Sequence, residues 1–589
     1  MCGIAGLMTR DGSTPDQGTL DRLISALEHR GPDGSGRHIS GDTALVQTRL
    51  AIIDLVTGDQ PLYEPEGAAL VANGEIYNYL ELRAEMAETP FRTDSDCETA
   101  LFVYREAGAD FATRLRGMYA IAIHDPADGG SLVLSRDPFG IKPLYYSESA
   151  AGFAFASEPQ ALLQAGLARR MLDPGARNVF LQLQFSCGRD FPISGIKRVL
   201  PGETLVVRRG RIVERHRQDA LPRGGPERIS EADAVARLDK AVRDSVGVHQ
   251  RSDVPYGLFL SGGIDSSAIL SMMDELNDQP VIAFTAGFDD DSVHDERDHA
   301  RSLAALLGAR HEEVSIGKDD FTNLLPTIAA SVDDPAADYA ILPTWVLASR
   351  AAQDLKVVLC GEGGDEIFAG YGRYRSVLRP WWMGGRALRR RGIFDGLDIL
   401  NRDFSGWRDA ISGQEVRDAS DGRSPLQTAQ ATDCTDWLTN DLLVKLDRCL
   451  MAHGLEGRTP FLDPVVAAAG FRVPDALKIH KGRGKWLLRK WLDGRLPEAD
   501  AFASKRGFSV PVGAWIAEEG DRLGALVSEQ DAVREIAKPD RVRQLFKAAG
   551  RKREGHAAWV LLFYALWHKS LIQGVDTRRM PIPDALEAS

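Results

Sequence analysis

Apolar residues follow two different periods along the chain. Through its first third, short apolar runs alternate with turn signals, a pattern typical of strands. The runs that predict strands lie at residues 70–72, 120–124, 131–135, 144–146 and 153–156. At residues 231–250 the period becomes helical, with Val235, Leu238, Val242 and Val246 on one face. We therefore expect a layered, mostly antiparallel α/β fold first, and a helix that opens a second unit.

Strands and helices alternate after this helix. The apolar runs that predict strands lie at residues 254–260, 281–288 and 356–360. Such alternation is typical of a doubly wound parallel sheet, whose ligands bind at the carboxyl ends of the strands. Ser261, Gly287 and Gly361 fall at three such ends, so we expect a binding site there.

The length of 589 residues suits several domains. A charged stretch with prolines and glycines, residues 211–229, is expected to link a first domain at 1–210 to a second at 230–575. Residues 576–589 contain prolines and are predicted to form a loose tail. Residues 376–430 are interpreted as a solvated helical insertion rather than a partner site. This insertion holds Trp381, Trp382, Arg386, Arg389, Arg390 and Arg391.

Composition and charge exclude several classes of protein. Hydrophobic residues make up 44% of the chain and charged residues 26%, as in ordinary soluble proteins. The net charge of -13 argues against a general nucleic-acid binder. No apolar run reaches about 18 residues and no signal peptide is recognised, so we expect neither a membrane protein nor an exported one. The six cysteines form no CxxC pair, which indicates free thiols in a reducing cytoplasm.

Residues 259–267, Phe-Leu-Ser-Gly-Gly-Ile-Asp-Ser-Ser, join a predicted strand to a predicted helix. Glycines let an anion approach the backbone, and the N–H groups and dipole of a helix N-terminus favour negative charge. The loop lacks the Gly-Lys-Ser/Thr of a Walker sequence. It resembles the Ser-Gly-Gly-x-Asp-Ser loop of ATP pyrophosphatases, which hold the pyrophosphate of ATP. A plain Gly/Ser turn is the alternative interpretation.

Cys2 offers a nucleophile at the start of a predicted strand. Removal of Met1 would leave Cys2 with both a thiol and a free α-amine. A model α-amine titrates near about 7.7–8.0 and a thiol near about 8.5, so the amine can act as base for its own thiol. An inert buried cysteine is the alternative, and for Cys2 alone it is the stronger interpretation.

Further motifs favour the catalytic interpretation of Cys2. They are His29-Arg30-Gly31-Pro32-Asp33, residues 49–55, Asn73-Gly74-Glu75-Ile76-Tyr77-Asn78, residues 93–98 and residues 136–146. Arg49 is predicted to begin a strand, and residues 93–98 to cap a helix. With Met-Cys-Gly-Ile, these motifs resemble the class II glutamine amidotransferase domain, an N-terminal-nucleophile hydrolase. The resemblance implies an αββα sandwich.

The residue types suit a free amino acid with a side-chain amide. Arg49 matches the carboxylate as a bidentate fork, while Asp96 and the region of Glu75 match the ammonium. The resemblance implies that Cys2 is the nucleophile and that Asn73 and Gly74 form the oxyanion hole. The residues expected to bind glutamine are Arg49, Leu50, Ala51, Ile52, Ile53, Asn73, Gly74, Glu75 and Asp96.

A second glycine-rich loop, Gly361-Glu362-Gly363-Gly364-Asp365-Glu366, carries carboxylates. ATP chemistry needs Mg²⁺, which one or two carboxylates and phosphate oxygens hold, and Asp265 and Asp365 are our candidates. An acidic solvated turn is the alternative interpretation.

Motifs at residues 441–448, 454–463, 484–489 and 505–511 complete a resemblance to glutamine-hydrolysing asparagine synthetases of the bacterial B type. This resemblance implies a catalytic role for Glu362 in adenylate formation and amide transfer, and for Lys485 near the α-phosphate. The residues expected to bind ATP are Phe259, Ser261, Gly262, Gly263, Asp265, Ser266, Ser267, Ala286, Cys360 and Gly361. Cys360 replaces the family's usual serine, and Gly457 replaces a small aliphatic residue.

The resemblance implies ATP-dependent amidation of aspartate, with ammonia from glutamine attacking a β-aspartyl adenylate. The products would be asparagine, AMP, pyrophosphate and glutamate, and a closed passage would link the two sites. The implied partners are glutamine, aspartate and ATP, and a second copy in a homodimer. Two alternatives stay open. One is an amidotransferase for another carboxylate, on a peptide, a sugar, a β-amino acid or another secondary metabolite; the other is a non-catalytic relative, which would be expected to have lost Cys2 or Asp265.

Overall fold

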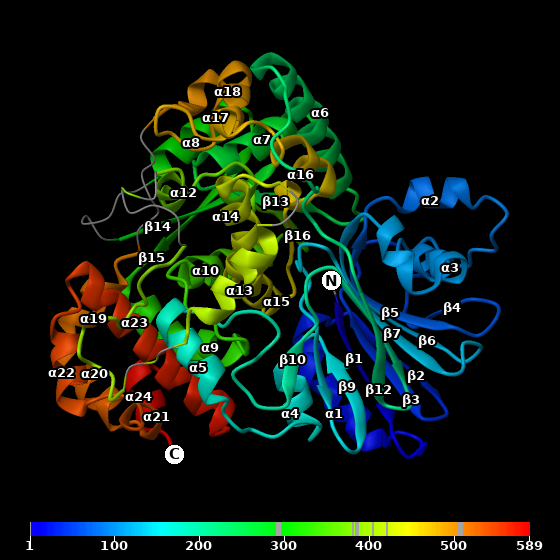
Figure 1. Cartoon of the computed structure of the whole chain (residues 1–589), viewed down its shortest axis with the longest axis horizontal. Helices are drawn as coiled ribbons and strands as arrows, with labels where there is room; N and C mark the ends of the chain where they lie inside the picture. The colour runs from blue at the N-terminus through cyan, green and yellow to red at the C-terminus, as the bar shows by residue number, and fades with distance from the viewer. Residues whose placement is uncertain are drawn as a thin grey trace.

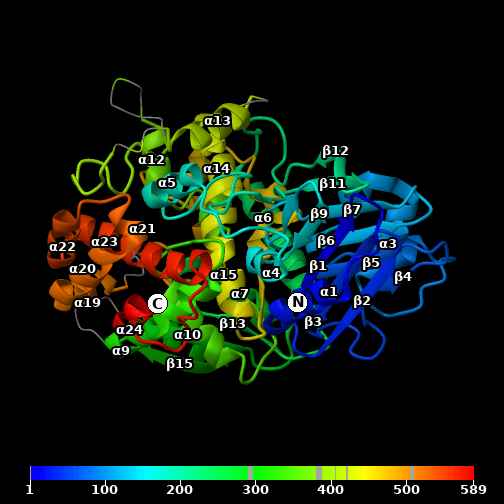
Figure 2. The same ribbon diagram turned by 90° about the horizontal axis from the view of Figure 1, so that it is seen from below.

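The computed structural model describes residues 2–289, 296–379, 382, 388–402, 404, 406–419, 422–503 and 510–589. Within this part of the chain, two bodies lie side by side (Figure 1). The first, blue to cyan, holds strands β1 to β12, and the second holds a parallel sheet and most of the helices. The described chain begins where the two bodies meet, as the N label shows in Figures 1 and 2.

Two antiparallel sheets of six strands form the centre of the first body, in the orders β10-β8-β9-β1-β3-β2 and β12-β11-β7-β6-β5-β4. The strands are β1 (Cys2–Thr9), β2 (Gly34–Ser40), β3 (Thr43–Arg49), β4 (Leu62–Tyr63), β5 (Ala69–Ile76), β6 (Gly117–Asp125), β7 (Ser131–Arg136), β8 (Tyr145–Glu148), β9 (Gly152–Ala156), β10 (Ile196–Arg198), β11 (Glu203–Arg208) and β12 (Arg211–Arg217). The helices are α1 (Gln17–Leu27), α2 (Tyr79–Glu85), α3 (Glu98–Ala107), α4 (Pro159–Gln164) and α5 (Pro174–Leu183).

The two sheets pack face to face. Ile4, Leu45, Val71 and Leu132 belong to one buried cluster drawn from both sheets. Helix α1 packs on β1 and β3 outside one sheet, and α3 packs on β5 outside the other. This layering is the αββα sandwich that the sequence predicted.

Strands β1 and β3 are antiparallel, with Cys2 directly opposite Arg49. Arg49 ends β3, and residues 50–55 form no strand, so the prediction that Arg49 begins one is wrong. Leu50 and Ile52 are apolar because they pack into a buried cluster shared with the second body. Packing across the junction thus produced the apolar run that suggested a strand.

The second body contains a parallel sheet in the order β15-β14-β13-β16-β17, which confirms the predicted doubly wound fold. Its strands are β13 (Tyr256–Phe259), β14 (Ile282–Phe288), β15 (Arg310–Ile316), β16 (Val357–Leu359) and β17 (Glu456–Arg458). The strand order reverses at β13, which has β14 on one side and β16 on the other. Ligands of open parallel sheets bind at such a switch point.

Helices cover both faces of this sheet. The helices are α6 (Glu231–His249), α7 (Ile264–Leu276), α8 (Arg297–Leu306), α9 (Lys318–Ser331), α10 (Ile341–Ala351), α11 (Gly364–Ile367), α12 (Gly372–Val377), α13 (Asp409–Asp418), α14 (Pro425–Asp433), the π-helix η4 (Cys434–Leu442), α15 (Leu443–Met451), α16 (Pro464–Gly470), α17 (Asp475–Lys478), α18 (Trp486–Arg495), α19 (Val512–Glu518), α20 (Gly520–Glu529), α21 (Asp531–Arg534), α22 (Pro539–Lys547), α23 (Lys552–Trp567) and α24 (Ile582–Glu587). The amphipathic helix predicted at 231–250 is α6.

Helix α23 is buried at the centre of a group of C-terminal helices, coloured orange to red in Figure 2. Trp559 Nε1 donates a hydrogen bond to the carbonyl of Ala337 at 2.7 Å, and Trp567 Nε1 donates to the carbonyl of Asp333 at 3.1 Å. The segment predicted to be a loose tail instead contains α24, whose Ile582 and Leu586 are each only 1% exposed. Residues 211–217 of the predicted linker form β12.

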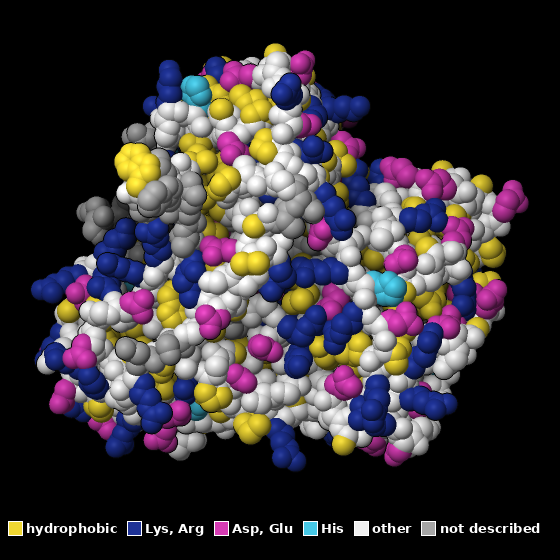
Figure 3. Space-filling model, viewed as in Figure 1, with side chains coloured by type: hydrophobic (Ala, Val, Ile, Leu, Met, Phe, Trp, Pro, Cys, Tyr) yellow, Lys and Arg dark blue, Asp and Glu magenta, His cyan; other side chains and the backbone are white. Residues whose placement is uncertain are grey.

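Exposed apolar side chains are scattered over the face drawn in Figure 3. Figure 3 shows small hydrophobic groups among charged side chains of both signs on one face. No helix among the described residues is both long and apolar enough to cross a membrane. All six cysteines are buried and free.

Candidate active sites

Cys2 lies at the start of β1 and is 7% exposed. Its backbone N–H donates to Asn73 Oδ1 at 3.1 Å, so the nucleophile candidate is attached to the strand that carries the oxyanion-hole candidates. Burial raises the pKa of the Cys2 thiol, and the backbone N–H of Leu50 and the side chain of Gln47 oppose that rise. The thiol therefore needs a base before it can react.

Asn73 and Gly74 lie next to each other on β5. The Nδ2 atom of Asn73 is buried and has no hydrogen-bond partner among the described residues. Gly74 has a φ of 152°, and a Cβ there would lie 2.0 Å from the carbonyl oxygen of Met118. Only glycine fits this position. The orphaned amide is the kind of donor that an oxyanion hole requires.

The Arg49 guanidinium contacts a carboxylate and a backbone carbonyl of the segment that follows β3. Its Nη1 lies 2.6 Å from Asp59 Oδ1, and its Nη2 donates to the carbonyl of Asp54. The side chain of Arg49 is 9% exposed and that of Asp59 is 82% exposed, so the partner can move away while the arginine stays. Of the apolar residues after it, Leu50 and Ile52 are buried, whereas Ala51 and Ile53 are half-buried.

The Asp96 carboxylate bonds strand β5 and does not cap helix α3. Its Oδ2 accepts a 2.6 Å hydrogen bond from the backbone N–H of Ile76, and α3 begins after Cys97 without a side-chain cap. The prediction that residues 93–98 cap this helix is therefore not met by a capping side chain. Burial raises the pKa of Asp96 to about 6, although the backbone N–H of Ile76 opposes this rise.

Glu75 faces the second body. Its carboxylate lies 3.4 Å from Arg458 Nη2, at the end of β17. Burial and the neighbouring Glu456 raise the pKa of Glu75. Among the residues expected to bind glutamine, Glu75 thus makes an ionic contact with the parallel-sheet body, whereas Leu50 and Ile52 make apolar ones.

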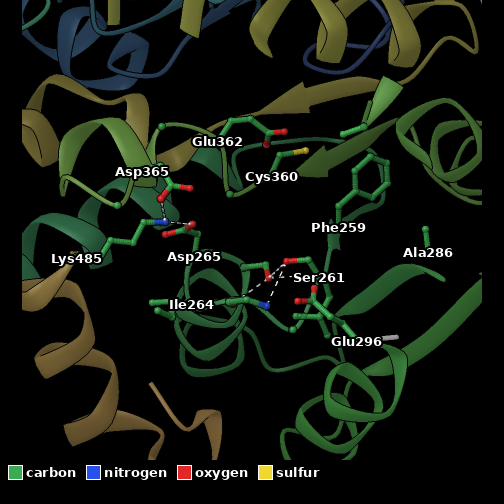
Figure 4. Close-up of a pocket in the computed structure, with 18 of the residues that line it drawn as sticks. Phe259, Ser261, Ile264, Asp265, Ala286, Glu296, Cys360, Glu362, Asp365 and Lys485 are labelled. Carbon is green, nitrogen blue, oxygen red and sulfur yellow. Dashed lines mark hydrogen bonds and ion pairs between the residues drawn. The ribbon is translucent and has the colours of Figure 1, made fainter. Parts of the chain in front are cut away.

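A cavity of about 710 Å³ lies at the carboxyl ends of β13, β14 and β16, at the switch point of the sheet. All residues expected to bind ATP line this cavity except Ser267, which lies beneath it and is 1% exposed. Figure 4 shows Phe259 and Ala286 on neighbouring strands and Ser261 at the loop that opens α7. The cavity therefore collects residues from three separate strand ends.

The Ser-Gly-Gly loop turns directly into α7. Gly262 has a φ of 71°, and the N–H of Gly263 donates to Ser261 Oγ at 3.2 Å. Gly263 is the N-cap of α7 and has no side chain to cover the helix N-terminus. The first turn of a 13-residue helix thus faces the cavity, which suits a phosphate group.

Lys485 joins the two carboxylates proposed as metal ligands. Its Nζ lies 2.5 Å from Asp265 Oδ2 and 2.8 Å from Asp365 Oδ1 (Figure 4). Burial lowers the pKa of Lys485, but the two carboxylates raise it by more than burial lowers it. The net shift is upward, so the side chain is charged. Among the described residues, no group of three or more His, Cys, Asp or Glu side chains could hold a metal.

Glu362 and Cys360 lie together on another wall of the cavity (Figure 4). Burial raises the pKa of Glu362, and the ammonium of Lys445 opposes this rise. The Cys360 side chain is 1% exposed, and its Sγ approaches the carbonyl of Val358 at 3.9 Å. The sequence motif at residues 505–509 lies outside the described residues, as do Trp381 and Arg386.

A buried ionic network that sequence reasoning missed connects Cys2 with helix α15 of the second body. Arg30 Nη1 and Nη2 lie 2.8 and 2.9 Å from the two carboxylate oxygens of Asp447 on α15, and Nη1 also contacts Glu158 at 2.7 Å. Arg30 Nε donates to the carbonyl of Cys2 at 3.3 Å. The side chain of Arg30 is fully buried. One guanidinium thus contacts Cys2, the nucleophile candidate, and a helix of the other body.

Arg448 extends this network. It lies 2.7 Å from Asp447 Oδ2 and 2.7 Å from Asp333 Oδ1. The network has five charged side chains, and all except the neighbours Asp447 and Arg448 come from sequence segments far apart. Only that adjacent pair, within the 441–448 motif, could have signalled a buried ion pair.

Comparisons with known proteins agree with this two-body arrangement. The family model described as glutamine amidotransferase domain matches residues 1–217, which makes the first body a glutamine amidotransferase domain. The family model described as asparagine synthase matches residues 237–569. The chain belongs to the asparagine synthase family, a family of enzymes.

Several curated relatives cover most of the chain. It is 33% identical to the glutamine-hydrolyzing asparagine synthetase 1 of Bacillus subtilis, over 99% of this chain and 98% of that protein. It is 30% identical to the glutamine-hydrolyzing asparagine synthetase 2 of the same organism, over 84% of this chain and 69% of that protein. The amidase chyE of Penicillium rubens is 28% identical over 87% of this chain and 89% of that protein.

Proposed function

We propose that this protein uses ATP and glutamine to convert the side-chain carboxylate of aspartate into the amide of asparagine. The observation that carries the proposal is a single cavity in which a phosphate-binding loop, the Asp265–Lys485–Asp365 cluster and Glu362 meet. Aspartate is the proposed acceptor because relatives of similar length are named asparagine synthetase. We also propose the domain division at residues 1–210 and 230–575.

The first half of the reaction takes place at Cys2. Once Met1 is removed, the α-amine of Cys2 takes the thiol proton, and the sulfur attacks the side-chain amide carbon of glutamine. The carbon–nitrogen bond breaks, ammonia leaves with the proton, and water hydrolyses the thioester to glutamate. Asn73 donates its unpartnered N–H to the oxyanion. Arg49 binds the substrate carboxylate, and Asp96 binds its ammonium.

The second half takes place in the cavity of the parallel-sheet body. A side-chain carboxylate oxygen of aspartate attacks the α-phosphorus of ATP, and the bond to the bridging oxygen breaks to release pyrophosphate. Lys485 balances the negative charge of the α-phosphate. Ammonia then attacks the acyl carbon of β-aspartyl-AMP, and AMP leaves. Glu362, whose pKa is raised by burial, accepts the proton that the attacking nitrogen loses.

Asp265 and Asp365 would hold Mg²⁺. Their oxygens converge on one ammonium group, and a carboxylate pair completed by phosphate oxygens is a donor set that Mg²⁺ accepts. When bound, the ion would neutralise charge on the polyphosphate. The proposal also includes a closed passage for ammonia from Cys2 to Glu362, since water would otherwise compete for the adenylate.

The test combines product analysis with the substitution Cys2→Ala. Wild-type protein given ATP, Mg²⁺, aspartate and glutamine should form asparagine, AMP, pyrophosphate and glutamate. The Cys2→Ala protein should lose glutamine use but keep amidation with ammonium chloride. Cys449→Ala is a matched control, because Cys449 is also a buried free cysteine but lies on α15. Loss of the ammonia reaction in Cys2→Ala, or no pyrophosphate from aspartate in wild type, would contradict the proposal.

A second candidate function keeps the machinery and changes the acceptor. The observation that favours it is the similarity to chyE, a relative named an amidase, over 87% of this chain. A panel of carboxylates in the pyrophosphate assay separates the two. If a different carboxylate is amidated and aspartate is not, the second candidate replaces the first.

A further inference from the structure

Arg458 is a fully buried arginine of the second body, and none of the steps above uses it. Three groups hold its guanidinium from its own side of the junction. Nε lies 2.5 Å from Glu456 Oε1, and Nη1 donates to the carbonyls of His249 at 2.8 Å and Arg251 at 2.7 Å. The remaining nitrogen, Nη2, is buried and has no hydrogen-bond partner among the described residues. The side chain is thus fixed in place with one nitrogen left over.

That nitrogen lies beside a residue of the glutamine site. Nη2 is 3.4 Å from Glu75 Oε2, which is also buried and accepts no hydrogen bond within the described part of the chain. Glu75 and Asn73 are two residues apart on β5, so their side chains lie on the same face of the strand. Asn73 Oδ1 accepts a hydrogen bond from the backbone N–H of Cys2. Arg458 therefore reaches the strand face that carries an oxyanion-hole candidate.

The surroundings of Glu75 explain why its carboxylate needs a cation. Burial and the carboxylates of Glu456 and Asp96 raise the pKa of Glu75, and Arg458 opposes this rise. A carboxyl group that binds an ammonium has to be ionised and has to keep one orientation. Without the guanidinium, repulsion between like charges would favour protonation of Glu75 or rotation of its side chain away from Asp96.

The backbone of Arg458 also supports the ATP cavity. Arg458 ends β17, and its carbonyl accepts a 2.7 Å hydrogen bond from the N–H of Cys360. Cys360 lines the cavity, two residues before Glu362. One residue of the second body thus contacts both a wall of the cavity and a residue of the glutamine site.

We infer that Arg458 is a positioning residue of the glutamine site, which holds the Glu75 carboxylate where it binds the ammonium of glutamine. This inference rests on the proposed function and deepens it, because the first body then needs a residue of the second to bind its substrate. Arg458 is placed to act through Glu75 and not on the reacting atoms. Its loss should therefore raise the KM for glutamine and leave kcat, which reports the thioester chemistry at Cys2, nearly unchanged.

The experiment measures glutamate release from glutamine by the full chain. Arg458→Lys keeps a positive charge, but a single ammonium cannot reach Glu456, two carbonyls and Glu75 at the same time. The substitution should raise the KM for glutamine at least about tenfold and keep kcat within about twofold of wild type. Ammonium-dependent pyrophosphate release should stay near the wild-type rate, which would show that the second body is folded.

Asp463→Asn is the matched control. Asp463 Oδ2 lies 2.9 Å from Arg116 Nε across the same junction, and the Asp463 side chain is 1% exposed. The substitution removes a buried ion pair between the two bodies without touching Glu75. The KM for glutamine should therefore stay at the wild-type value, whereas a general loosening of the junction would raise it in both variants.

A double-mutant cycle with Glu75→Gln tests whether Arg458 acts through Glu75. Glu75→Gln alone should raise the KM for glutamine, because the substrate ammonium loses its charged partner. Adding Arg458→Lys should then raise the KM by less than about twofold, since the arginine has no carboxylate left to hold. If Arg458 has a purely structural role, the two effects on KM should multiply.

The outcomes separate this inference from the proposed function. An unchanged KM in Arg458→Lys, effects that multiply in the double variant, or an equal rise in Asp463→Asn overturns the inference alone. Absence of glutamate release from wild-type protein overturns the proposed function. If Arg458→Lys does not fold, Glu75→Asp takes its place, because it keeps the charge and draws the carboxylate away from Arg458. A KM for glutamine that stays at the wild-type value in Glu75→Asp overturns the inference.

Discussion

The substitution Asp447→Asn tests whether the buried ionic network holds the two bodies together. Asp447 accepts two hydrogen bonds from Arg30, and the two side chains are 4% and 0% exposed. Removing one partner of a buried ion pair costs about 3–5 kcal/mol. Arg30 keeps Glu158 at 2.7 Å and Arg448 keeps Asp333 at 2.7 Å, so we expect the lower end, about 3 kcal/mol.

The loss of stability in Asp447→Asn should also depend on pH. Burial raises the pKa of Asp447, but the Arg30 guanidinium holds it below its ordinary value. Because the pKa of Asp447 is lower in the folded protein, its ionised carboxylate stabilises the fold at pH values above the unfolded pKa of about 3.9. This stabilisation is lost as the pH falls through the folded pKa. The difference in stability between wild type and Asp447→Asn should therefore be full near neutral pH and shrink in acid.

Urea denaturation followed by tryptophan fluorescence measures the stability, and the ratio of glutamate to pyrophosphate measures coupling. Because Arg30 also contacts the carbonyl of Cys2, Asp447→Asn should release more glutamate per pyrophosphate than wild type. Glu313→Gln is the control, since Glu313 makes a bidentate pair with an Arg301 side chain that is 54% exposed. If Asp447→Asn shifts the denaturation midpoint no more than Glu313→Gln, the network does not hold the junction.

Two further predictions concern the glutamine site. Gly74→Ala places a Cβ 2.0 Å from the carbonyl oxygen of Met118. Glutamate release should therefore fall at least about a hundredfold, the usual cost of a lost oxyanion donor, while ammonia-dependent amidation survives. Equal losses of both activities would point to misfolding. Burial raises the pKa of Asp96 to about 6, so its carboxyl is neutral below that pH, and kcat/KM for glutamine hydrolysis should fall there because the substrate ammonium loses its partner. A pH profile that stays level across pH 6, with wild-type protein, would remove Asp96 from glutamine binding.

Features that are contiguous in sequence could be predicted well. The strand, loop and helix around Ser261 form one local unit, and its residues line the cavity together. The segment after Arg49 shows where an apolar pattern misleads. Its apolar residues Leu50 and Ile52 are buried against the other body and do not belong to a strand. An apolar pattern records burial and does not say what covers the residue.

Residues that meet only through tertiary folding could not be predicted. Arg30 and Asp447 are separated by 417 residues, and nothing in either local sequence pairs them. Lys445 on α15 has the appearance of an ordinary charged residue in a helix. Asp96 shows a different limit, since an Asp before a helix predicts a cap, whereas this one bonds the strand β5.

Helix α23 sets an order for the protein's assembly. It supports the loop that carries Asp338 through hydrogen bonds to Asp333 and Ala337. A ribosome delivers the chain from its N-terminus, and domains fold largely as they emerge. The amidotransferase body can form early, whereas the loop at residues 333–338 gains its support only after α23 has been synthesised. The first body can therefore be complete before the cavity of the second body has all its support.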